Sequence, residues 1–303
     1  MDVVIAGAGS IGLLLGSFLA EAGMDVTFYV RREEQAKLIR GEGIQRINQD
    51  GTISIFHAKS TTDITKISRT ALIIVAVKFT GLRDLLLEIK NAGLINPLLF
   101  VQNGIGHFEI VKNFRSLEIA FATVEQGARR IDNRTVSHNG IGMLTIATLY
   151  SDDNVFDLIG QAHSDIFPVS YHTDAELILM RKVLINCMIN PLTAILKVEN
   201  GDLLSNVHCQ TLFNTLYKEL MCAFPEMQSV LSYEEIVEVC KKTAKNKSSM
   251  LADRMSGNPM EIDTIVTATI RKASGQAKSL PLLSALEQML YAIDREGEKS
   301  WME

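Results

Sequence analysis

The chain opens with Val3-Val4-Ile5-Ala6-Gly7-Ala8-Gly9-Ser10-Ile11-Gly12, from which the architecture of its first half can be predicted. Four apolar residues indicate a buried strand, and the glycines match the pattern GxGxxG directly before an apolar helix over 11–22. In this context Gly7 allows a tight turn, Gly9 lets the backbone approach a pyrophosphate, and Gly12 lets the helix pack closely on the strand. The anion would lie on unpaired N–H groups at the positive end of the helix dipole. A glycine-rich turn without a ligand is the alternative, but the order strand, loop and helix favours a dinucleotide site.

The rest of the first half alternates short apolar segments with amphipathic ones. Further strands are predicted at 26–30, 71–77 and 98–101, and a further helix at 80–91. Strands that are apolar on both faces indicate a parallel sheet covered by helices on each side. Two segments with turn residues, 44–56 around Asp50-Gly51 and 130–147, are expected to be hairpins added antiparallel to that sheet.

Helical periodicity dominates from about residue 174 to the C-terminus. Helices are predicted at 174–190, 207–224, 233–252, 260–274 and 282–294. A length of 303 residues suits two domains of ordinary size. The expected fold class is therefore an α/β N-terminal Rossmann domain over 1–170 and an all-α C-terminal domain over 171–303.

The composition argues against several classes of protein. Hydrophobic residues make up 47% and charged residues 21%, which is ordinary for a globular protein. The formal charge of −5 argues against a nucleic-acid partner, because neutralising phosphates needs a basic surface. There is no run of 18 apolar residues, and the four cysteines form no CxxC pair. The first residues lack a basic segment before the apolar stretch, so no signal peptide is expected. We therefore expect reduced thiols, no membrane partner and a cytoplasmic location.

The end of the second predicted strand indicates which dinucleotide binds. An NAD site usually carries Asp or Glu about 20 residues after the glycine loop, bonded to the ribose 2′-OH. Here the strand ends in Arg31-Arg32, with no carboxylate at its tip. A guanidinium can donate two parallel hydrogen bonds to a 2′-phosphate, which a carboxylate would repel. The sequence therefore predicts NADPH rather than NADH as cofactor, unless both arginines only cap a helix or face water.

Two further strands end in residues suited to ligand contact. Lys78 directly follows the apolar strand 71–77, and Asn103-Gly104 follows the strand 98–101. In open α/β sheets ligands bind at the carboxyl ends of the strands, so both positions are candidates. The alternatives are a solvated lysine at a helix start and an ordinary Asn-Gly turn.

One segment of the helical half, 181–194, has an unusual polar pattern. Lys182, Asn186 and Asn190 are spaced four residues apart, so they share one helix face, while the residues between them are mostly apolar. Buried polar groups need partners, and a polar substrate is one candidate; a neighbouring helix is the other. Pro191 is expected to end or kink the helix directly after Asn190.

In their order along the chain, these motifs resemble those of the ketopantoate reductases (2-dehydropantoate 2-reductases). The resemblance covers essentially the whole chain and is carried by Gly7 to Gly12, Arg31, Lys78, Asn103-Gly104, Gly127-Ala128-Arg129-Arg130, the segment from Lys182 to Ala194, Asn200-Gly201, Ser248-Ser249-Met250-Leu251-Ala252-Asp253 and Glu261-Ile262-Asp263. It implies NADPH-dependent reduction of 2-dehydropantoate to pantoate, a step towards pantothenate and coenzyme A. It also implies that the first domain binds NADPH and that the second holds the substrate and catalytic groups.

The resemblance further implies a role for each matching residue. Lys182 would donate the proton, and Glu261 would lie near the nicotinamide ribose and help to orient the catalytic site. The residues implied to contact the cofactor are Gly7, Ala8, Gly9, Ser10, Ile11, Gly12, Arg31, Lys78, Asn103, Ala128 and Glu261. Those implied to contact the substrate, a small 2-oxo acid, are Asn103, Lys182, Asn186, Asn190, Asn200 and Ser249, with Asp253 in support. One departure is Met180, where many relatives carry an aromatic residue, and it bears on the shape of the pocket rather than on the reaction.

Two other functions stay open at the level of the sequence. The chain could reduce another branched 2-oxo acid, like the related hydroxyacid dehydrogenases, because fold alone does not separate these activities. It could also bind NADP(H) without chemistry, although such a protein has no use for the lysine–asparagine face. No metal is expected, since no cluster of carboxylates and histidines has ligand spacing. Apolar surfaces of the helical half could pair in a homodimer.

Overall fold

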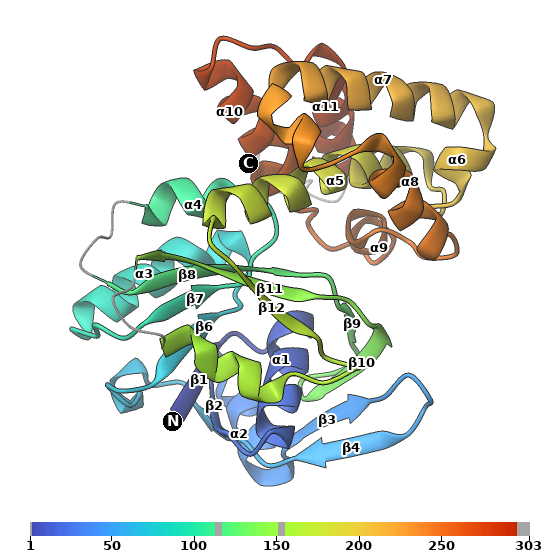
Figure 1. The fold of residues 1–303 in the computed structure, drawn as a ribbon. Helices are drawn as coiled ribbons and strands as arrows, with labels where there is room; N and C mark the ends of the chain where they lie inside the picture. The colour runs from blue at the N-terminus through green and yellow to red at the C-terminus, as the bar shows by residue number, and fades with distance from the viewer. Residues whose placement is uncertain (1, 113–116, 151–154, 296–303) are drawn as a thin grey trace, which may run out of the picture. The chain divides into compact units, whose positions relative to one another are not determined.

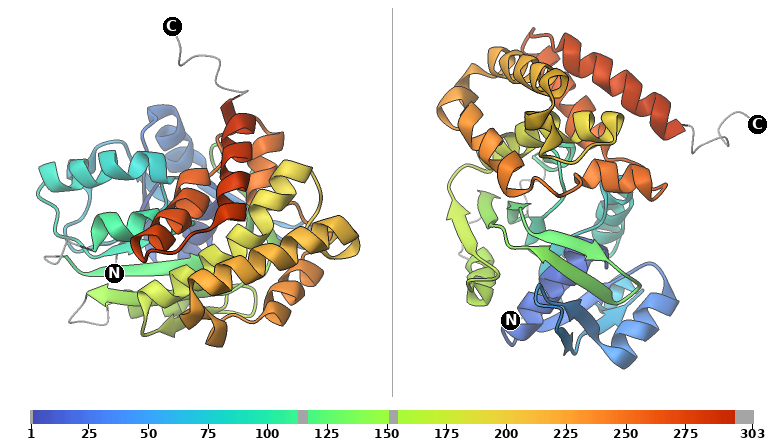
Figure 2. Two further views of the ribbon diagram at one scale, coloured as in Figure 1. Left: turned by 90° about the horizontal axis from the view of Figure 1, so that it is seen from above. Right: turned by 90° about the vertical axis from the view of Figure 1, so that its right-hand side faces the viewer.

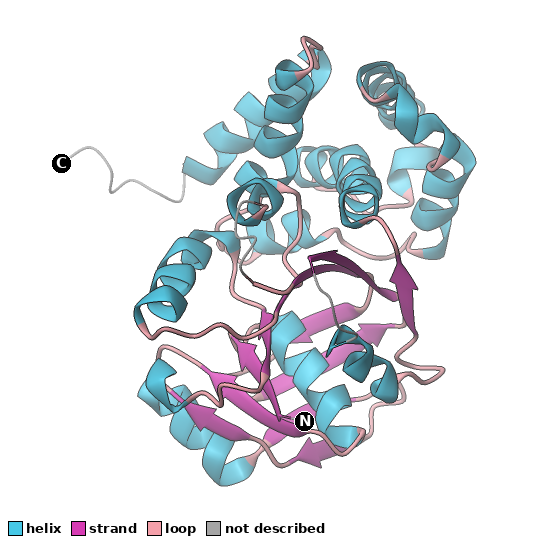
Figure 3. Cartoon of the chain, turned by 60° about the vertical axis from the view of Figure 1, so that its left-hand side comes forward, coloured by secondary structure: helices cyan, strands magenta, loops and turns pink. Residues whose placement is uncertain are grey.

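The computed structural model describes residues 2–112, 117–150 and 155–295. Contacts divide the chain into unit 1, comprising Met1–Gln102 and Ile110–Ile178, and unit 2, comprising Asn103–Glu109 and Leu179–Glu303. Within the described residues every strand belongs to unit 1, whereas unit 2 is helical, as the colours of Figure 3 show. The predicted combination of an α/β domain with an all-α domain is confirmed, and a boundary near residue 170 stays a prediction.

Unit 1 is built on a mostly parallel, eight-stranded sheet (Figure 1). Its strands, in spatial order, are β12 (Val169–His172), β11 (Leu144–Tyr150), β8 (Ile119–Val124), β7 (Leu98–Phe100), β6 (Leu72–Val75), β1 (Asp2–Ala6), β2 (Asp25–Tyr29) and β5 (Lys59–Thr61). The six strands from β8 to β5 pair in parallel, and β11 pairs antiparallel with β8. All of β6 and all of β1 except Asp2 are buried, which agrees with the apolar runs of the sequence.

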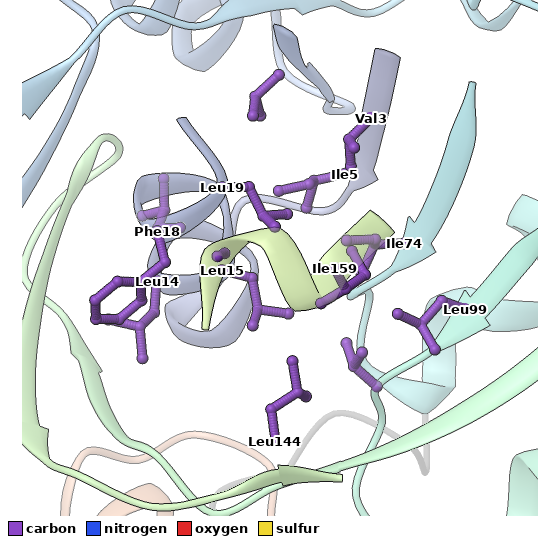
Figure 4. Packing of buried hydrophobic residues seen from close by; sticks show 14 of the residues in the cluster. Val3, Ile5, Leu14, Leu15, Phe18, Leu19, Ile74, Leu99, Leu144 and Ile159 are labelled. Atoms are coloured by element: carbon purple, nitrogen blue, oxygen red, sulfur yellow. The ribbon is translucent and has the colours of Figure 1, made fainter. Parts of the chain in front are cut away.

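The core of unit 1 is organised around helix α1 (Ser10–Glu21). Figure 4 shows its side chains Leu14, Leu15, Phe18 and Leu19 gathered with Val3 and Ile5 of β1, Ile74 of β6 and Ile159 of the 3₁₀ segment η3 (Val155–Ala162). Burying each such side chain stabilises the fold by about 1.5–3 kcal/mol, which holds the segment after β1 firmly in place. The other helical segments of the α/β half are η1 (Ile64–Lys66), η2 (Phe79–Gly81), α2 (Glu33–Glu42), α3 (Leu82–Asn91) and α4 (Gly106–Val111), whose first residues belong to unit 2.

The predicted antiparallel additions to the main sheet are confirmed only for residues 144–147, which lie in β11 and pair antiparallel with β8. The other strands of the two predicted segments form a separate four-stranded sheet, so for them the expectation was wrong. Its order is β4 (Ile53–Phe56), β3 (Ile44–Ile47), β10 (Thr135–Gly140) and β9 (Gly127–Arg130). The hairpin around Asp50-Gly51 forms as predicted, but β3 then pairs in parallel with β10, and Figures 1 and 2 show the two hairpins side by side. The turn residues Asn139-Gly140 do not form a hairpin between β10 and β11, because β11 pairs with β8 in the main sheet. Pairing between segments about 90 residues apart leaves no local signal in the sequence.

Arg46 attaches this small sheet to helix α1. Its side chain is 2% exposed, and its Nη2 donates to both carboxylate oxygens of Glu21 at 2.9 and 2.8 Å. The guanidinium carbon lies 4.0 Å from the ring centroid of Phe18 and 5.0 Å from that of Phe56. A desolvated guanidinium between two aromatic rings and a carboxylate is stable only while its charge is paired.

We expect Glu21→Ala to lower the free energy of unfolding by about 1.5–3 kcal/mol, because the buried guanidinium of Arg46 loses its charged partner and keeps only its hydrogen bonds to Asn48 and Ser17. Arg46→Met should cost less, since Glu21 is 46% exposed and its carboxylate can turn to water. The control is Glu42→Ala, which removes the more exposed partner of Arg134 and should cost below about 1 kcal/mol. Urea denaturation measures all three, and equal losses for Glu21→Ala and Glu42→Ala would contradict the assignment.

Unit 2 consists of helices packed around a long central one. They are α5 (Ala175–Leu196), α6 (Asp202–Ser205), α7 (Val207–Ala223), η4 (Pro225–Ser229), α8 (Tyr233–Lys242), α9 (Ser249–Met255), the π-helical segment η5 (Asp263–Thr267), α10 (Ala268–Gly275) and α11 (Pro281–Arg295). The predictions for α7 and α11 agree closely with these bounds. Two further predictions are corrected by the structure.

Helix α5 does not end at Asn190 but runs through Pro191 to Leu196. Residues 191–194 are all buried, and this burial compensates for the hydrogen bond that proline cannot make. The helix predicted over 233–252 is split by a loop between α8 and α9, whose backbone carbonyls accept hydrogen bonds from the segment that follows α5. Asn200 N donates to Asn246 O at 3.1 Å, and Gly201 N donates to Ala244 O at 3.0 Å.

Helix α5 is also long and apolar enough to cross a membrane. Its most apolar 18-residue window has a mean hydropathy of 1.3, and 78% of that window is buried inside the protein. The central helix of a folded unit is apolar because it is buried, and it passes the same test of length and composition as a membrane span. These two properties of α5 are therefore weak evidence for a membrane span.

Candidate active site

The glycine-rich loop after β1 has a backbone that larger residues would not fit. Gly7 has φ of +109°, and a Cβ there would lie 2.9 Å from the backbone nitrogen of Val77. A Cβ on Gly12 would lie 2.0 Å from the carbonyl oxygen of Gly7. These close approaches explain why glycine is needed at both positions, where the predicted strand, tight turn and helix follow one another.

The loop lies where the order of strands in the main sheet reverses. From β1 the chain moves to β2 and β5 on one side, and then to β6, β7 and β8 on the other. The segments after β1 and β6 are therefore neighbours, and Ala76 N donates to Ala6 O at 2.9 Å. Lys78, exposed at the start of η2, follows directly. Ligands of open α/β sheets bind at this kind of crossing point.

The residues present at this loop fit the pyrophosphate of a dinucleotide. A Cβ on Gly9 would meet no atom within 4 Å, so the space in front of the loop is open. Gly9 is the N-cap of α1, no side chain caps the helix there, and its first turn contains no acidic residue. The N–H groups of Ser10 and Ile11 begin the helix and have no partner within it. A nicotinamide dinucleotide would therefore be held by Gly7 to Gly12 through backbone donors and the helix dipole.

The two arginines at the tip of β2 differ in their contacts. Both are exposed, and Arg32 donates from Nη2 to Oδ1 of Asn133 at 2.6 Å. Arg31 makes no side-chain hydrogen bond or ion pair with any other residue that the structure describes. Arg31 is thus the better candidate for a phosphate contact. Ala128, half-buried on β9, packs against the core of unit 1.

In unit 2 the polar face of α5 forms as predicted. Lys182 and Asn186 are half-buried, and Asn190 is 4% exposed. Cys187 points to another side, where its Sγ lies 3.5 Å from the carbonyl oxygen of Ile265. The Nδ2 of Asn190 is buried and has no hydrogen-bond partner among the described residues, which is a costly arrangement unless a ligand supplies one.

The next residues of the predicted substrate site surround the C-terminal half of α5. Thr193 Oγ1 donates to Ser248 Oγ at 2.7 Å, which brings the start of α9 against α5. Ser248 is buried and caps α9, whereas the predicted contact residue Ser249 is exposed. Asn200 is 7% exposed and donates from Nδ2 to Thr243 Oγ1 at 2.9 Å, while its Oδ1 is buried without a partner among the residues described. Asp253 is half-buried on α9.

Asn103 and Glu261 meet within unit 2, although 158 residues separate them. Asn103 Nδ2 donates to Glu261 Oε2 at 3.2 Å, and both side chains are half-buried. Because this bond uses the amide nitrogen, the Oδ1 of Asn103 is left to accept a hydrogen bond from a ligand. The pair is therefore oriented by a contact that sequence spacing could not reveal.

The backbone beside Asn103 is fixed by the π-helical segment η5, of which the sequence singled out only Asp263. Thr264 O accepts a hydrogen bond from Ile105 N at 3.0 Å, and Gly104, with φ of +82°, lies against the same carbonyl. The segment is supported from α11, where Tyr291 donates to Asp263 at 2.5 Å and contacts Thr267. Short π-helical segments occur often at functional sites, and this one holds Asn103 in place.

Other chemistry is less suited to this chain. Burial lowers the pKa of His107 to about 3 and raises the pKa of Cys187 to about 12, so the ring and the thiol are both neutral near pH 7. Among the described residues, no group of three or more His, Cys, Asp or Glu side chains could hold a metal ion. A hollow of about 560 Å³ beside α7 and α8 is lined by Tyr217, Lys218, Met221, Cys222, Gln228, Ser232, Tyr233 and Glu234, none of which was predicted as a site residue.

Comparison with known proteins finds matches along nearly the whole chain. Residues 3–150 match the family model described as "Ketopantoate reductase PanE/ApbA", and residues 174–294 match "Ketopantoate reductase PanE/ApbA C terminal". The 2-dehydropantoate 2-reductase of Listeria innocua is 33% identical, with 99% of this chain and 98% of the relative covered.

Solved structures show the same similarity. The crystal structure of a probable 2-dehydropantoate 2-reductase from Bacillus subtilis matches with a TM-score of 0.87 and 30% identity, covering 97% of this chain and 100% of the other. A D-mandelate dehydrogenase, solved with NADH and anilino(oxo)acetate, matches with a TM-score of 0.84 at 21% identity, covering 98% and 100%. At this identity the second likeness concerns the fold alone.

Proposed function

The chain belongs to the ketopantoate reductase family of nicotinamide-dependent oxidoreductases, and on this basis we propose that it reduces 2-dehydropantoate to pantoate with NADPH and with Lys182 as proton donor. Similarity to 2-dehydropantoate 2-reductases over the whole chain supports the reaction. The pathway that follows from it is pantothenate biosynthesis, in the cytoplasm. The proposal needs no nucleic-acid or membrane partner, and a homodimer formed through unit 2 would be detected by sedimentation.

The observation that carries the proposed substrate is the pair of buried amide groups near the C-terminal half of α5. Asn190 offers a donor without a partner and Asn200 an acceptor without a partner, as far as the described residues go. A 2-oxo acid with a 4-hydroxyl group suits both, since its carboxylate accepts and its hydroxyl donates. Asn186 and Ser249 would complete the contacts to the substrate, with Asp253 in support.

The chain's own residues would carry out the proton transfer and the orientation. NADPH, when bound, supplies the hydride. As negative charge builds on the 2-oxo oxygen, the ammonium group of Lys182 would stabilise it and then give that oxygen its proton. Asn103, held by Glu261, would orient the nicotinamide ribose and the substrate.

The preference for NADPH is proposed from the tip of β2. Arg31 is exposed there, no carboxylate occupies the tip, and Arg32 is already bonded to Asn133. Arg31 and Lys78 would contact the phosphate side of the nucleotide, and Ala128 would lie against it. Guanidinium groups bind phosphate bidentately, which favours the nucleotide with the additional phosphate.

We expect Arg31→Ala to raise the KM for NADPH about 10–100-fold, in line with the loss of about 1.5–3 kcal/mol for a charge-assisted hydrogen bond. The KM for NADH should change by less than about two-fold, because that nucleotide has no 2′-phosphate to lose contact with. Steady-state kinetics with both nucleotides measure the ratio. An equal loss for both, or a wild-type enzyme that prefers NADH, would contradict the role of Arg31.

The proposed function is tested by following NADPH oxidation with 2-dehydropantoate beside 3,3-dimethyl-2-oxobutanoate, which differs by the missing 4-hydroxyl group. A site built to bond that hydroxyl should favour 2-dehydropantoate by at least about 10²-fold in kcat/KM. Equal rates would argue for a broader 2-oxo acid reductase. Tight NADPH binding without oxidation by any 2-oxo acid would leave a nucleotide-binding protein instead.

A further inference from the structure

The side-chain amide of Gln35 contacts the glycine-rich loop directly. Gln35 is in the first turn of α2 and is only 6% exposed. Its Nε2 donates to the carbonyl oxygen of Ala8 at 3.2 Å and to that of Asn133 at 2.8 Å. One buried amide thus joins the loop, helix α2 and the turn between β9 and β10.

The turn that Gln35 contacts is itself well fixed. Asp132 Oδ1 accepts hydrogen bonds from the backbone N–H groups of Arg134 at 2.8 Å and Thr135 at 2.7 Å. Asn133 accepts at Oδ1 from Arg32, the N-cap residue of α2. The turn is therefore held from two sides, and Gln35 connects it to Ala8 rather than to solvent.

Ala8 lies between the two glycines whose backbone would face a pyrophosphate. Fixing its carbonyl oxygen fixes the peptide plane that ends at Gly9 N, and so the direction of the first donor of the loop. From this geometry we infer that Gln35, with Asn133 behind it, is a positioning residue that preorganises the loop for the pyrophosphate of the nucleotide. The inference rests on the proposed function only in requiring that a nicotinamide dinucleotide binds at this loop.

This role predicts a distinct pattern of nucleotide binding. NADPH and NADH share the pyrophosphate, so loosening the loop should weaken both by the same factor. A residue that contacts only the 2′-phosphate, as proposed for Arg31, would weaken NADPH alone. Loss of preorganisation raises the apparent Kd in inverse proportion to the fraction of molecules whose loop is competent to bind.

The test is Gln35→Met, which keeps the length of the side chain and removes both donors without adding charge. Fluorescence titration of NADPH and of NADH, without substrate, should give Kd values raised about ten-fold or more for both nucleotides. Gln35→Asn, which keeps an amide but is one methylene shorter, should show the same equal loss and takes its place should Gln35→Met not fold.

The matched control is Asn96→Leu. Asn96 is 1% exposed and also donates from one amide nitrogen to two carbonyl oxygens, those of Ser68 at 2.8 Å and Ala71 at 2.7 Å. These precede β6, at the opposite end of the strands from the loop. Asn96→Leu should lower the melting temperature as Gln35→Met does, yet leave both Kd values within two-fold of wild type.

Three results would overturn the inference. Binding of both nucleotides by Gln35→Met within two-fold of wild type would do so, as would a loss confined to NADPH or an equal loss in Asn96→Leu. Wild-type protein that binds neither nucleotide would instead overturn the proposed function, and the inference with it. The first three outcomes leave nucleotide binding by the wild type intact, so the two failures are distinguishable.

Discussion

Lys182→Ala should lower kcat about 10²–10⁴-fold with 2-dehydropantoate and NADPH, the usual contribution of a general acid. The ammonium group is expected both to stabilise the developing negative charge and to supply the proton, and alanine can do neither. Lys182→Gln should lower kcat by a similar factor, because a neutral amide keeps hydrogen-bond donors but cannot give up a proton near pH 7. Steady-state kinetics with saturating NADPH measure the change.

Binding of the nucleotide separates this role from a structural one. The Kd for NADPH, measured by fluorescence without substrate, should stay within about two-fold of wild type in Lys182→Ala, since the cofactor loop belongs to unit 1. Lys218→Ala, which removes an exposed lysine of α7, should leave both kcat and Kd unchanged. Wild-type turnover in Lys182→Ala would refute the proposed proton donor.

Gly104→Ala should be the most damaging single-methyl addition in unit 2. A left-handed backbone costs a non-glycine residue about 1–2 kcal/mol, and overpacking usually costs about 1–3 kcal/mol more. Here the new Cβ would lie 2.1 Å from the carbonyl oxygen of Thr264, which cannot move without breaking its bond to Ile105. We expect a loss of about 2–5 kcal/mol in stability, together with a loss of turnover because Asn103 is displaced from Glu261.

Gly257→Ala is the matched control for that substitution. Gly257 also has a positive φ, of +66°, but a Cβ there would meet no atom within 4 Å. Its variant should lose only the backbone contribution of about 1–2 kcal/mol and keep wild-type turnover. Thermal denaturation and NADPH oxidation measure both variants, and equal behaviour would show that contact with Thr264 is unimportant.

The local parts of the fold could be predicted from the sequence, and the pairing between distant parts could not. The run 71–77 predicts β6 because a strand buried on both faces must be apolar throughout. The turn at Asp50-Gly51 predicts the β3–β4 hairpin for equally local reasons. Which sheet that hairpin joins depends on its pairing with β10, and no periodicity encodes this. Pro191 is likewise overridden by tertiary burial, which a propensity argument does not include.

The candidate site divides in the same way. Gly7, Gly9 and Gly12 follow from a pattern with a physical reason, and the face of Lys182, Asn186 and Asn190 follows from helical spacing. The contact between Asn103 and Glu261 depends on the folded chain, and only the family resemblance placed these residues in one site. Gln35 carries no motif at all, because an amide that bonds two backbone carbonyls can stand anywhere in a sequence.

The course of the chain between the two units bears on how the protein can be dissected. The segment Asn103–Glu109 leaves the main sheet after β7 and belongs to unit 2, and the chain then returns to unit 1 at Ile110. A fragment that stops near residue 170 would contain this segment but lack Glu261 and Thr264, which bind it. Ile105 and Phe108, which are buried in the whole protein, would then be exposed to solvent, and newly exposed apolar side chains promote aggregation. A soluble nucleotide-binding fragment would therefore need a hydrophilic linker in place of residues 103–109.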